Sequence, residues 1–172
     1  MKIAIVSDSH SNAKNFKKII AWLNKQNIKT ILHCGDIGSP ESLKESLENF
    51  DGKFFGVFGN MDYDYKFLVE QYNKIPGVKI ELKFLDITIF RKIGITHKPE
   101  DAKKMALSGN YDIVFYGHTH KPWEETITGY GNKQCRFINP GEVAGQIYRP
   151  TFAVYDVEKD LLELKILDRL EE

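Results

Sequence analysis

The chain has 172 residues, and its 24 Lys and Arg balance its 24 Asp and Glu, so the formal net charge is zero. This length fits one core of useful size, and we expect a single domain over residues 1–172. The balanced charge disfavours sequence-independent binding to nucleic acid. No apolar run approaches the length of a membrane span, so no transmembrane helix is predicted.

The amino terminus and the cysteines indicate a reducing compartment. Residues 1–6 enter an apolar strand directly, without the basic segment, long apolar stretch and cleavage site of a signal peptide. Cys34 and Cys135 form no paired metal motif. We therefore expect a cytoplasmic protein.

Apolar periodicity and capping signals in the first half predict alternating strands and helices. Buried strands are predicted at residues 2–6, 30–33 and 53–58. The first helix has an apolar face made by Phe16, Ile19, Ile20 and Leu23. Ser39 and Pro40 predict the start of a second helix, whose apolar face continues through Leu47 to Phe50. Asp64 is predicted to cap a third helix that runs to Tyr72.

The second half is richer in predicted strands. Residues 79–82 and 84–90 are predicted to form a hairpin, and a short helix is predicted to begin at Pro99 and end at Gly109. Further strands are predicted at residues 92–95, 112–116, 124–128, 134–138, 151–157 and 161–167. This order predicts two packed sheets with helices outside rather than a single doubly wound sheet.

Polar side chains follow several of these apolar strands, at the point where each strand ends. The residues in these positions are Asp8, His10, Asp36, Asn60, His97, His118 and His120. Because the carboxyl ends of strands in α/β sheets share one edge, where ligands bind, we expect these side chains to converge there.

The chemical types of these residues indicate a metal centre. Carboxylate, amide and imidazole donors suit Mn, Fe, Co, Ni and Zn, and no thiolate is needed. Asp8 and His10 are two residues apart, as are His118 and His120, and this spacing in an extended chain points both side chains to one side. Seven donors are too many for one tetrahedral zinc ion but suit two metals that share a carboxylate.

Five motifs in this order resemble those of the calcineurin-like metallophosphoesterase superfamily: Asp8-Ser9-His10, Gly35-Asp36, Gly59-Asn60, His97 and Gly117-His118-Thr119-His120. The short length without an inserted cap resembles the small YfcE-like phosphodiesterases, and the resemblance extends from Met1 to near Pro150. It implies a four-layer α/β/β/α sandwich of two mixed sheets. It also implies metal-dependent hydrolysis of phosphoesters, with a small phosphodiester as the expected substrate.

The resemblance also implies a role for each matched residue. One metal would be held by Asp8, His10, Asp36 and His120, and the other by Asp36, Asn60, His97 and His118. Asp36 would bridge the two, and a hydroxide shared by both metals would attack phosphorus. Asp36 and Asn60 are therefore the expected catalytic residues. Two divalent ions are expected as cofactors, manganese first, with Ni, Fe, Co or Zn as alternatives.

The sequence departs from the family pattern at two positions near the expected site. Met61 stands where larger family members often have a His that protonates the leaving group, so we predict slow hydrolysis that favours good leaving groups. Asp62 matches the following acidic position and is expected to orient a ligand. Lys98 stands where the family usually has Gly, and it would either contact the substrate phosphate or point into solvent.

Other residues and functions have competing interpretations. His33 is interpreted as a core or supporting histidine, and Glu142, in an Asn-Pro-Gly-Glu turn, as structural. A non-catalytic scaffold like the retromer vacuolar sorting subunit is the first alternative, disfavoured because every ligand type is retained. A nuclease is the second, disfavoured by the balanced charge. The exposed strand edges of the carboxy-terminal half are expected to allow a homodimer.

Overall fold

The computed structural model describes residues 1–62 and 65–170, where strands and helices alternate at first and strands then predominate. The first half contains β1 (Lys2–Val6), α1 (Ala13–Lys25), β2 (Thr30–His33), α2 (Pro40–Ser46), β3 (Lys53–Val57), α3 (Tyr65–Asn73) and β4 (Val78–Glu81). The second half contains β5 (Leu85–Ile89), β6 (Arg91–Ile95), α4 (Pro99–Leu107), β7 (Ile113–Phe115), β8 (Trp123–Thr128), β9 (Gln134–Asn139), β10 (Thr151–Asp156) and β11 (Leu161–Ile166). The position predicted to cap the third helix, Asp64, lies outside the described residues.

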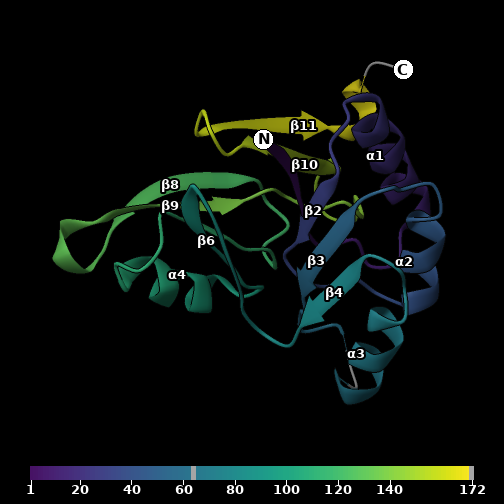
Figure 1. The fold of residues 1–172 in the computed structure, drawn as a ribbon, viewed down its shortest axis with the longest axis horizontal. Coiled ribbons are helices and arrows are strands. Elements are labelled where there is room, and N and C mark those ends of the chain that lie inside the picture. The colour runs from purple at the N-terminus through teal and green to yellow at the C-terminus, as the bar shows by residue number, and fades with distance from the viewer. Residues whose placement is uncertain (63–64, 171–172) are drawn as a thin grey trace.

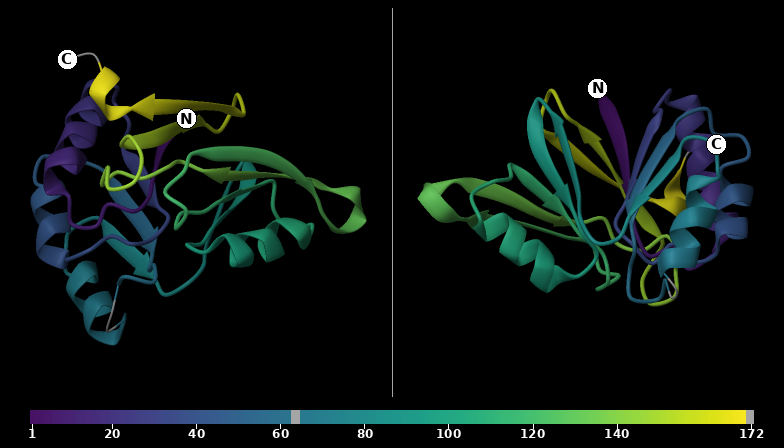
Figure 2. Two further views of the ribbon diagram at one scale, coloured as in Figure 1. Left: turned by 180° about the vertical axis from the view of Figure 1, so that it is seen from behind. Right: turned by 60° about the horizontal axis from the view of Figure 1, so that its bottom comes forward.

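Two sheets pack face to face. The larger has six strands in the order β11-β10-β1-β2-β3-β4, and the smaller has five in the order β5-β6-β7-β9-β8. Helices α1, α2 and α3 cover the outer side of the larger sheet, and α4 covers the outer side of the smaller one (Figures 1 and 2). Both sheets mix parallel and antiparallel pairs. The predicted four-layer α/β/β/α sandwich is confirmed.

The strands at the centre of the larger sheet are buried on both faces. In β1, Ala4 and Val6 belong to the core under the helices, whereas Ile3 and Ile5 belong to the core between the sheets. A parallel strand in this environment is a continuous apolar run, which is the pattern that predicted β1. Because β1, β2 and β3 are parallel neighbours, their carboxyl ends lie at one edge of the sheet.

Helix α2 is shorter than its apolar pattern predicted. Ser39 caps it by accepting the Ser42 N–H at 3.1 Å, as expected for a Ser before Pro40. The helix ends at Ser46, and the chain continues in tighter turns through Phe50. Leu47 and Phe50 still pack against the core from these turns. The periodicity therefore predicted burial correctly, but it did not locate the end of the helix.

The predicted hairpin between residues 79–82 and 84–90 is wrong. β4 pairs in parallel with β3 in the larger sheet, while β5 pairs with β6 in the smaller sheet. The residues between them therefore cross from one sheet to the other. Val78 and Ile80 fill the core under the helices, whereas Leu85 fills the core between the sheets. Alternating apolar residues fit either pairing, and this packing decides against the hairpin.

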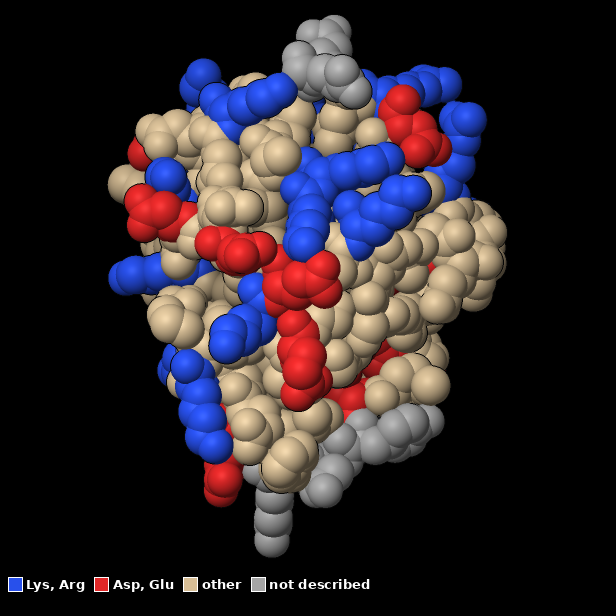
Figure 3. All heavy atoms as spheres, turned by 90° about the vertical axis from the view of Figure 1, so that its right-hand side faces the viewer, with Lys and Arg blue, Asp and Glu red and all other residues tan. Residues whose placement is uncertain are grey.

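The outer face formed by α1 and α2 carries charges of both signs. Figure 3 shows Lys and Arg mixed with Asp and Glu on this face, rather than one continuous basic surface. Lys17 of α1 pairs with Glu45 of α2, with 2.6 Å between Nζ and Oε1. None of the described helices has the length and apolar character needed to cross a bilayer.

Candidate metal centre

The structure brings the seven predicted donors together at one rim, where strands of both sheets end. The larger sheet supplies Asp8, His10, Asp36 and Asn60 after its strands, and the smaller supplies His97, His118 and His120. The two sheets lean together so that the carboxyl ends of β1 to β3 lie near those of β6 and β7 (Figure 2). The donors form two groups that meet at two buried carboxylates.

The first group combines Asp8, His10 and His120. His120 Nε2 lies 3.4 Å from Asp8 Oδ1 and 3.4 Å from His10 Nε2. His10 Nε2 lies 4.0 Å from Asp8 Oδ1. One ligand atom from each residue therefore falls within 4.8 Å of the other two, close enough to share one cation.

The second group combines Asn60, His97 and His118, and it reaches Asp36. Asn60 Oδ1 lies 2.9 Å from His97 Nε2 and 2.7 Å from His118 Nδ1. Asp36 Oδ2 lies 3.4 Å from His97 Nε2. The other ring nitrogen of His97, Nδ1, donates to the Cys34 carbonyl oxygen at 2.9 Å, which fixes the orientation of the ring.

The donor set fits divalent cations. Asp8 is fully buried and Asp36 is only 2% exposed. Within the described part of the chain, neither carboxylate pairs with Lys or Arg, and their only ion-pair partners are His10, His97 and His120. Burying carboxylates without strong compensation is costly. Cations that prefer oxygen and nitrogen ligands would supply that compensation.

The pKa values of the buried groups show the same demand for positive charge. Burial raises the pKa of Asp8, which the imidazoles of His97 and His120 offset only in part. Burial also raises the pKa of Asp36, but the hydrogen bond and charge of His97 and the Met61 N–H outweigh it and lower this pKa overall. Burial lowers the pKa of His97. The hydrogen bond to Asp36 and the charges of Asp8 and Asp36 outweigh the effect of burial, so the pKa of His97 is raised overall.

Left-handed backbone conformations concentrate at this rim. Positive φ values occur at Asp8 (51°), His10 (43°), Asp36 (54°), His118 (70°) and His120 (61°). Each such non-glycine residue costs roughly 1 kcal/mol or more, and strain of this kind gathers at functional sites. The premise that these pairs lie in extended chain is therefore wrong. His118 and His120 point into different donor groups instead of to one side.

Two glycines allow the loops of the rim to approach each other. Gly35 has a φ of +100°, and a Cβ there would lie 2.6 Å from His97 Nδ1. A Cβ on Gly59 would lie 2.0 Å from Asp36 Oδ1. Any larger residue at either position would displace a donor side chain, which explains why glycine precedes Asp36 and Asn60.

Asp62 connects the loops that carry Asp36 and Asn60. Its carboxylate, 1% exposed, accepts backbone N–H groups from Ile37 at 3.3 Å, Gly38 at 3.1 Å and Gly59 at 2.8 Å. It contacts no donor side chain of the rim in these hydrogen bonds. Asp62 therefore positions the donors through the backbone of both loops, rather than through a side-chain contact.

His33 supports the rim from the core, as interpreted from its place within an apolar run. Ser9 Oγ donates to the Ile37 carbonyl at 2.9 Å, so it accepts a hydrogen from His33 Nε2, also at 2.9 Å. The Gly35 N–H donates to His33 Nδ1 at 3.1 Å. These partners select the neutral ring with its hydrogen on Nε2, and the ring is fully buried against Phe16.

Acid is expected to destabilise the fold through His33. Burial lowers the pKa of His33 to about 3, against about 6.5 in an unfolded chain. The unfolded chain therefore binds a proton that the folded chain does not, and stability falls as pH drops below about 6.5. At pH 5 the loss is about 2 kcal/mol. Urea unfolding of the wild type and of His33→Gln at pH 7 and 5 measures this loss of stability. The difference in unfolding free energy between the two proteins should be smaller at pH 5 than at pH 7. A constant difference would refute the assignment.

A model of the calcineurin-like phosphoesterase superfamily domain matches residues 1–160 of the chain. The chain belongs to the calcineurin-like phosphoesterase superfamily. The resemblance carried by the five sequence motifs is thereby confirmed at the level of the family.

One curated relative and one solved structure, each more than 30% identical to this chain, are named as phosphodiesterases. Phosphodiesterase MJ0936 of Methanocaldococcus jannaschii is 36% identical over 163 residues, which cover 92% of this chain and 95% of that protein. A solved structure of an archaeal phosphodiesterase has a TM-score of 0.84 at 33% identity and covers 96% of this chain and 99% of that one.

More distant structures share the fold alone. YfcE, a phosphoesterase from E. coli, has a TM-score of 0.66 at 17% identity, covering 97% of this chain and 100% of that one. Vps29 from Entamoeba histolytica has a TM-score of 0.64 at 20% identity, covering 96% of this chain and 97% of that one. Likenesses at these identities show the fold and not the function of this chain, so the functional argument rests on the donor groups.

Glu142 is a buried acid beside the centre whose contact with a donor the sequence interpretation missed. Its Oε2 lies 3.1 Å from His120 Nδ1, and its carboxylate also accepts the N–H groups of Gln146, Ile147 and Tyr148. Burial raises the pKa of Glu142, but these three N–H groups outweigh it and lower the pKa. The ionised carboxylate is therefore a close charge partner of His120 Nδ1, which favours a hydrogen on that nitrogen and leaves Nε2 facing the first donor group.

The Glu142→Gln variant is expected to bind Mn²⁺ about 10- to 100-fold more weakly than the wild type, because the outer partner of a ligand histidine sets its tautomer and basicity. Calorimetric titration with Mn²⁺ measures the affinity, and circular dichroism reports whether the fold is kept. Glu158→Gln, on an acid remote from the rim, serves as the matched control. Equal affinities for all three proteins would show that Glu142 only stabilises the turn.

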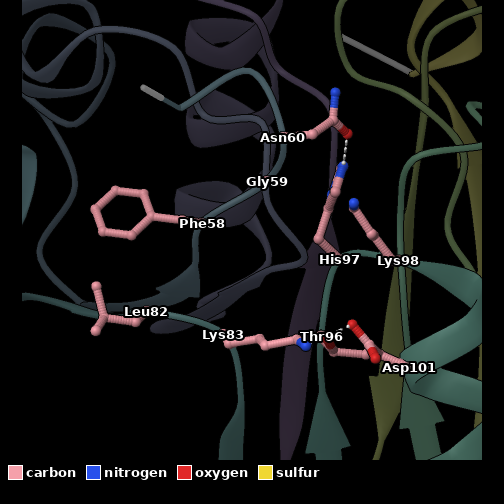
Figure 4. Close-up of a pocket in the computed structure, with 9 residues that line it drawn as sticks. All are labelled: Phe58, Gly59, Asn60, Leu82, Lys83, Thr96, His97, Lys98 and Asp101. Carbon is pink, nitrogen blue, oxygen red and sulfur yellow. Dashed lines mark hydrogen bonds and ion pairs between the residues drawn. The ribbon is translucent and has the colours of Figure 1, made fainter. Parts of the chain in front are cut away.

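Lys98 lies at the rim of the second donor group. It is the residue before α4, is exposed, and forms no ion pair with any residue that the structure describes. In Figure 4 its side chain runs alongside that of His97, on the side of Asn60. Of the two expectations for Lys98, this placement favours contact with a substrate at the centre.

Proposed function

We propose that this family member is a phosphodiesterase that uses two divalent cations. One cation would be held by Asp8, His10, Asp36 and His120, and the other by Asp36, Asn60, His97 and His118. When bound, such a pair activates water and neutralises phosphate oxygens. The convergence of seven donors, two of them buried carboxylates, is the observation that carries the proposal.

The residues of the chain would prepare the reaction by fixing these donors. Asp36 is oriented by the Met61 N–H at 2.8 Å, and His97 by the Cys34 carbonyl oxygen. Such preorganisation is effective because no donor has to reorient as charge develops on phosphorus. In the reaction, a water molecule loses a proton to solvent, its oxygen forms a bond to phosphorus, and the bond from phosphorus to one ester oxygen breaks. That oxygen leaves as an anion with its organic group and takes a proton from solvent.

A diester is proposed over a monoester, and manganese over other metals. The relative named as a phosphodiesterase, at 36% identity, supports the first choice. The mixed oxygen and nitrogen donors accept Mn, Ni, Fe, Co or Zn, and the choice among them depends partly on availability in the cell. The balanced charge of the whole chain agrees with a small substrate rather than nucleic acid.

We also propose a single functional domain over residues 1–172 and a cytoplasmic location. Buried, unpaired Cys34 and Cys135 support the reducing compartment. The edge strands β8 and β11 offer surfaces for a homodimer, with Trp123 of β8 51% exposed. Sedimentation of the purified protein tests the dimer.

The test of the activity uses purified protein, bis(p-nitrophenyl) phosphate and Mn²⁺. Release of p-nitrophenol should require Mn²⁺, stop when EDTA removes the metal, and return when Mn²⁺ is restored. Absence of metal-dependent turnover at every pH where the protein stays folded would overturn the proposal. The convergence of all seven donors favours the enzyme over the scaffold alternative.

The rate is expected to depend steeply on the leaving group. Met61 is 48% exposed, and its thioether has no proton to give to a leaving oxygen. General acid catalysis typically contributes about 10²- to 10⁴-fold, so alkyl diesters should react more slowly than aryl diesters by at least this factor. Turnover of bis(p-nitrophenyl) phosphate and of dimethyl phosphate measures the ratio. Comparable rates would mean that another residue supplies the proton.

A further inference from the structure

A cavity of about 560 Å³ opens beside the second donor group. Asn60 and His97 form part of its wall, so it is continuous with the proposed metal centre (Figure 4). A volume of this size suits an organic group much larger than a phosphate. The metal centre alone does not require this space.

One side of the cavity is apolar. In Figure 4, Phe58 and Leu82 lie on the same side, opposite His97 and Lys98. Phe58 is only 4% exposed, and its ring packs against Tyr72 with 5.9 Å between the ring centroids. Leu82 is 59% exposed. A flat ring that covers Leu82 would remove apolar surface from water, whereas a methyl group would cover little of it.

The other side carries one positive charge without an ion-pair partner. Lys83 Nζ pairs with Asp101 Oδ2 at 3.1 Å, so its charge is balanced within the wall. Lys98 forms no ion pair with the residues that the structure describes, and it lies beside His97. The charge available to an anion is therefore at the end of the cavity nearest the metal centre.

We propose that this cavity is a subsite for one ester group of the phosphodiester, and that this group is a flat ring with an apolar face, either an aryl group or a nucleobase. The ring would lie against Phe58 and Leu82, and Lys98 would contact the phosphate. This inference rests on the proposed function, because it assumes that the phosphate binds at the metal centre. It adds a substrate class that the donors alone do not define.

Binding of phosphonates, which carry a single organic group and no cleavable ester bond, tests the apolar wall. Calorimetry on the Mn²⁺-loaded protein should show phenylphosphonate binding about tenfold more tightly than methylphosphonate. Leu82→Ser should remove most of this preference. Leu164→Ser, at another exposed leucine, 48% exposed on β11, should keep it. A thymidine phosphonate in the same assay distinguishes an aryl group from a nucleobase. Tighter binding of the thymidine phosphonate than of phenylphosphonate would identify a nucleobase, and the reverse order would identify an aryl group.

The charge is tested separately from the wall. Lys98→Met should weaken the binding of methylphosphonate and of phenylphosphonate by the same factor, about tenfold, because both compounds carry the same anionic group. Lys103→Met, on the exposed part of α4, is the control and should change neither. An unequal effect on the two phosphonates would overturn the assignment of Lys98 to the phosphate.

These outcomes are independent of turnover. Equal affinity for the two phosphonates in the wild type, or a preference that survives Leu82→Ser, would overturn the subsite while leaving the phosphodiesterase proposal intact. A phenyl preference that depends on Leu82 in a protein without turnover would keep the subsite and reject the activity. Failure of both phosphonates to bind would overturn the subsite as well.

Discussion

The Asp36→Asn variant is expected to hydrolyse an aryl phosphodiester about three orders of magnitude more slowly than the wild type, a loss of about 4 kcal/mol of transition-state stabilisation. Asp36 Oδ2 lies 3.4 Å from His97 Nε2 and 3.9 Å from His10 Nε2, so this one carboxylate reaches both donor groups. Asn keeps its size but removes the negative charge that two adjacent cations would share. The variant should therefore also bind less metal per chain.

Measuring kcat/KM and metal content on the same preparations makes this result interpretable. Asp51→Asn, at a carboxylate that is fully exposed, is the control and should change neither quantity. Circular dichroism checks that Asp36→Asn is folded. A folded variant with full metal content and near wild-type kcat/KM would remove Asp36 from the reaction.

The Asp62→Ala variant is expected to lose about 3 kcal/mol or more of unfolding free energy. Alanine would leave the N–H groups of Ile37, Gly38 and Gly59 without their acceptor, and each unsatisfied buried donor costs about 1–3 kcal/mol. Because these N–H groups belong to the two loops that carry Asp36 and Asn60, metal affinity should fall with stability.

Urea unfolding with and without Mn²⁺ separates the two effects. Asp62→Asn keeps one oxygen acceptor and should lose less stability than Asp62→Ala, and Asp168→Ala at an exposed acid should lose little. If Asp62→Ala unfolds at the same urea concentration as the wild type, the carboxylate does not connect the loops as its hydrogen bonds indicate.

The donor residues could be predicted because their positions follow from a simple rule of sheet geometry. Buried parallel strands are apolar runs, and whatever follows them lies at one edge, so Asp8, Asp36 and Asn60 could be placed together before any contact was known. The same rule applied to β6 and β7 placed His97 and His118. The fold class followed from the order of the elements.

Features that depend on pairing between distant segments could not be predicted. The alternation of apolar residues along a strand does not show which strand pairs with it. For this reason β4 and β5 were predicted to form a hairpin, although they lie in different sheets. The left-handed conformations at Asp8 and His118 have no composition signal, since neither residue is glycine.

Glu142 was underestimated for a related reason. Its only signal was an acid between a turn and the apolar pair Val143 and Ala144, which identifies a buried carboxylate but not its partner. His120 is the partner, 22 residues earlier in the chain, and the sequence does not show that β7, which precedes it, is the parallel neighbour of β9. Long-range partners of this kind need coordinates.

Anomalous diffraction at the manganese edge, on crystals grown with Mn²⁺, would locate the cations themselves. A two-metal centre should give two peaks per chain with Asp36 between them, one beside Asp8, His10 and His120 and the other beside Asn60, His97 and His118. A single peak, or peaks away from these residues, would contradict a two-metal centre at this rim.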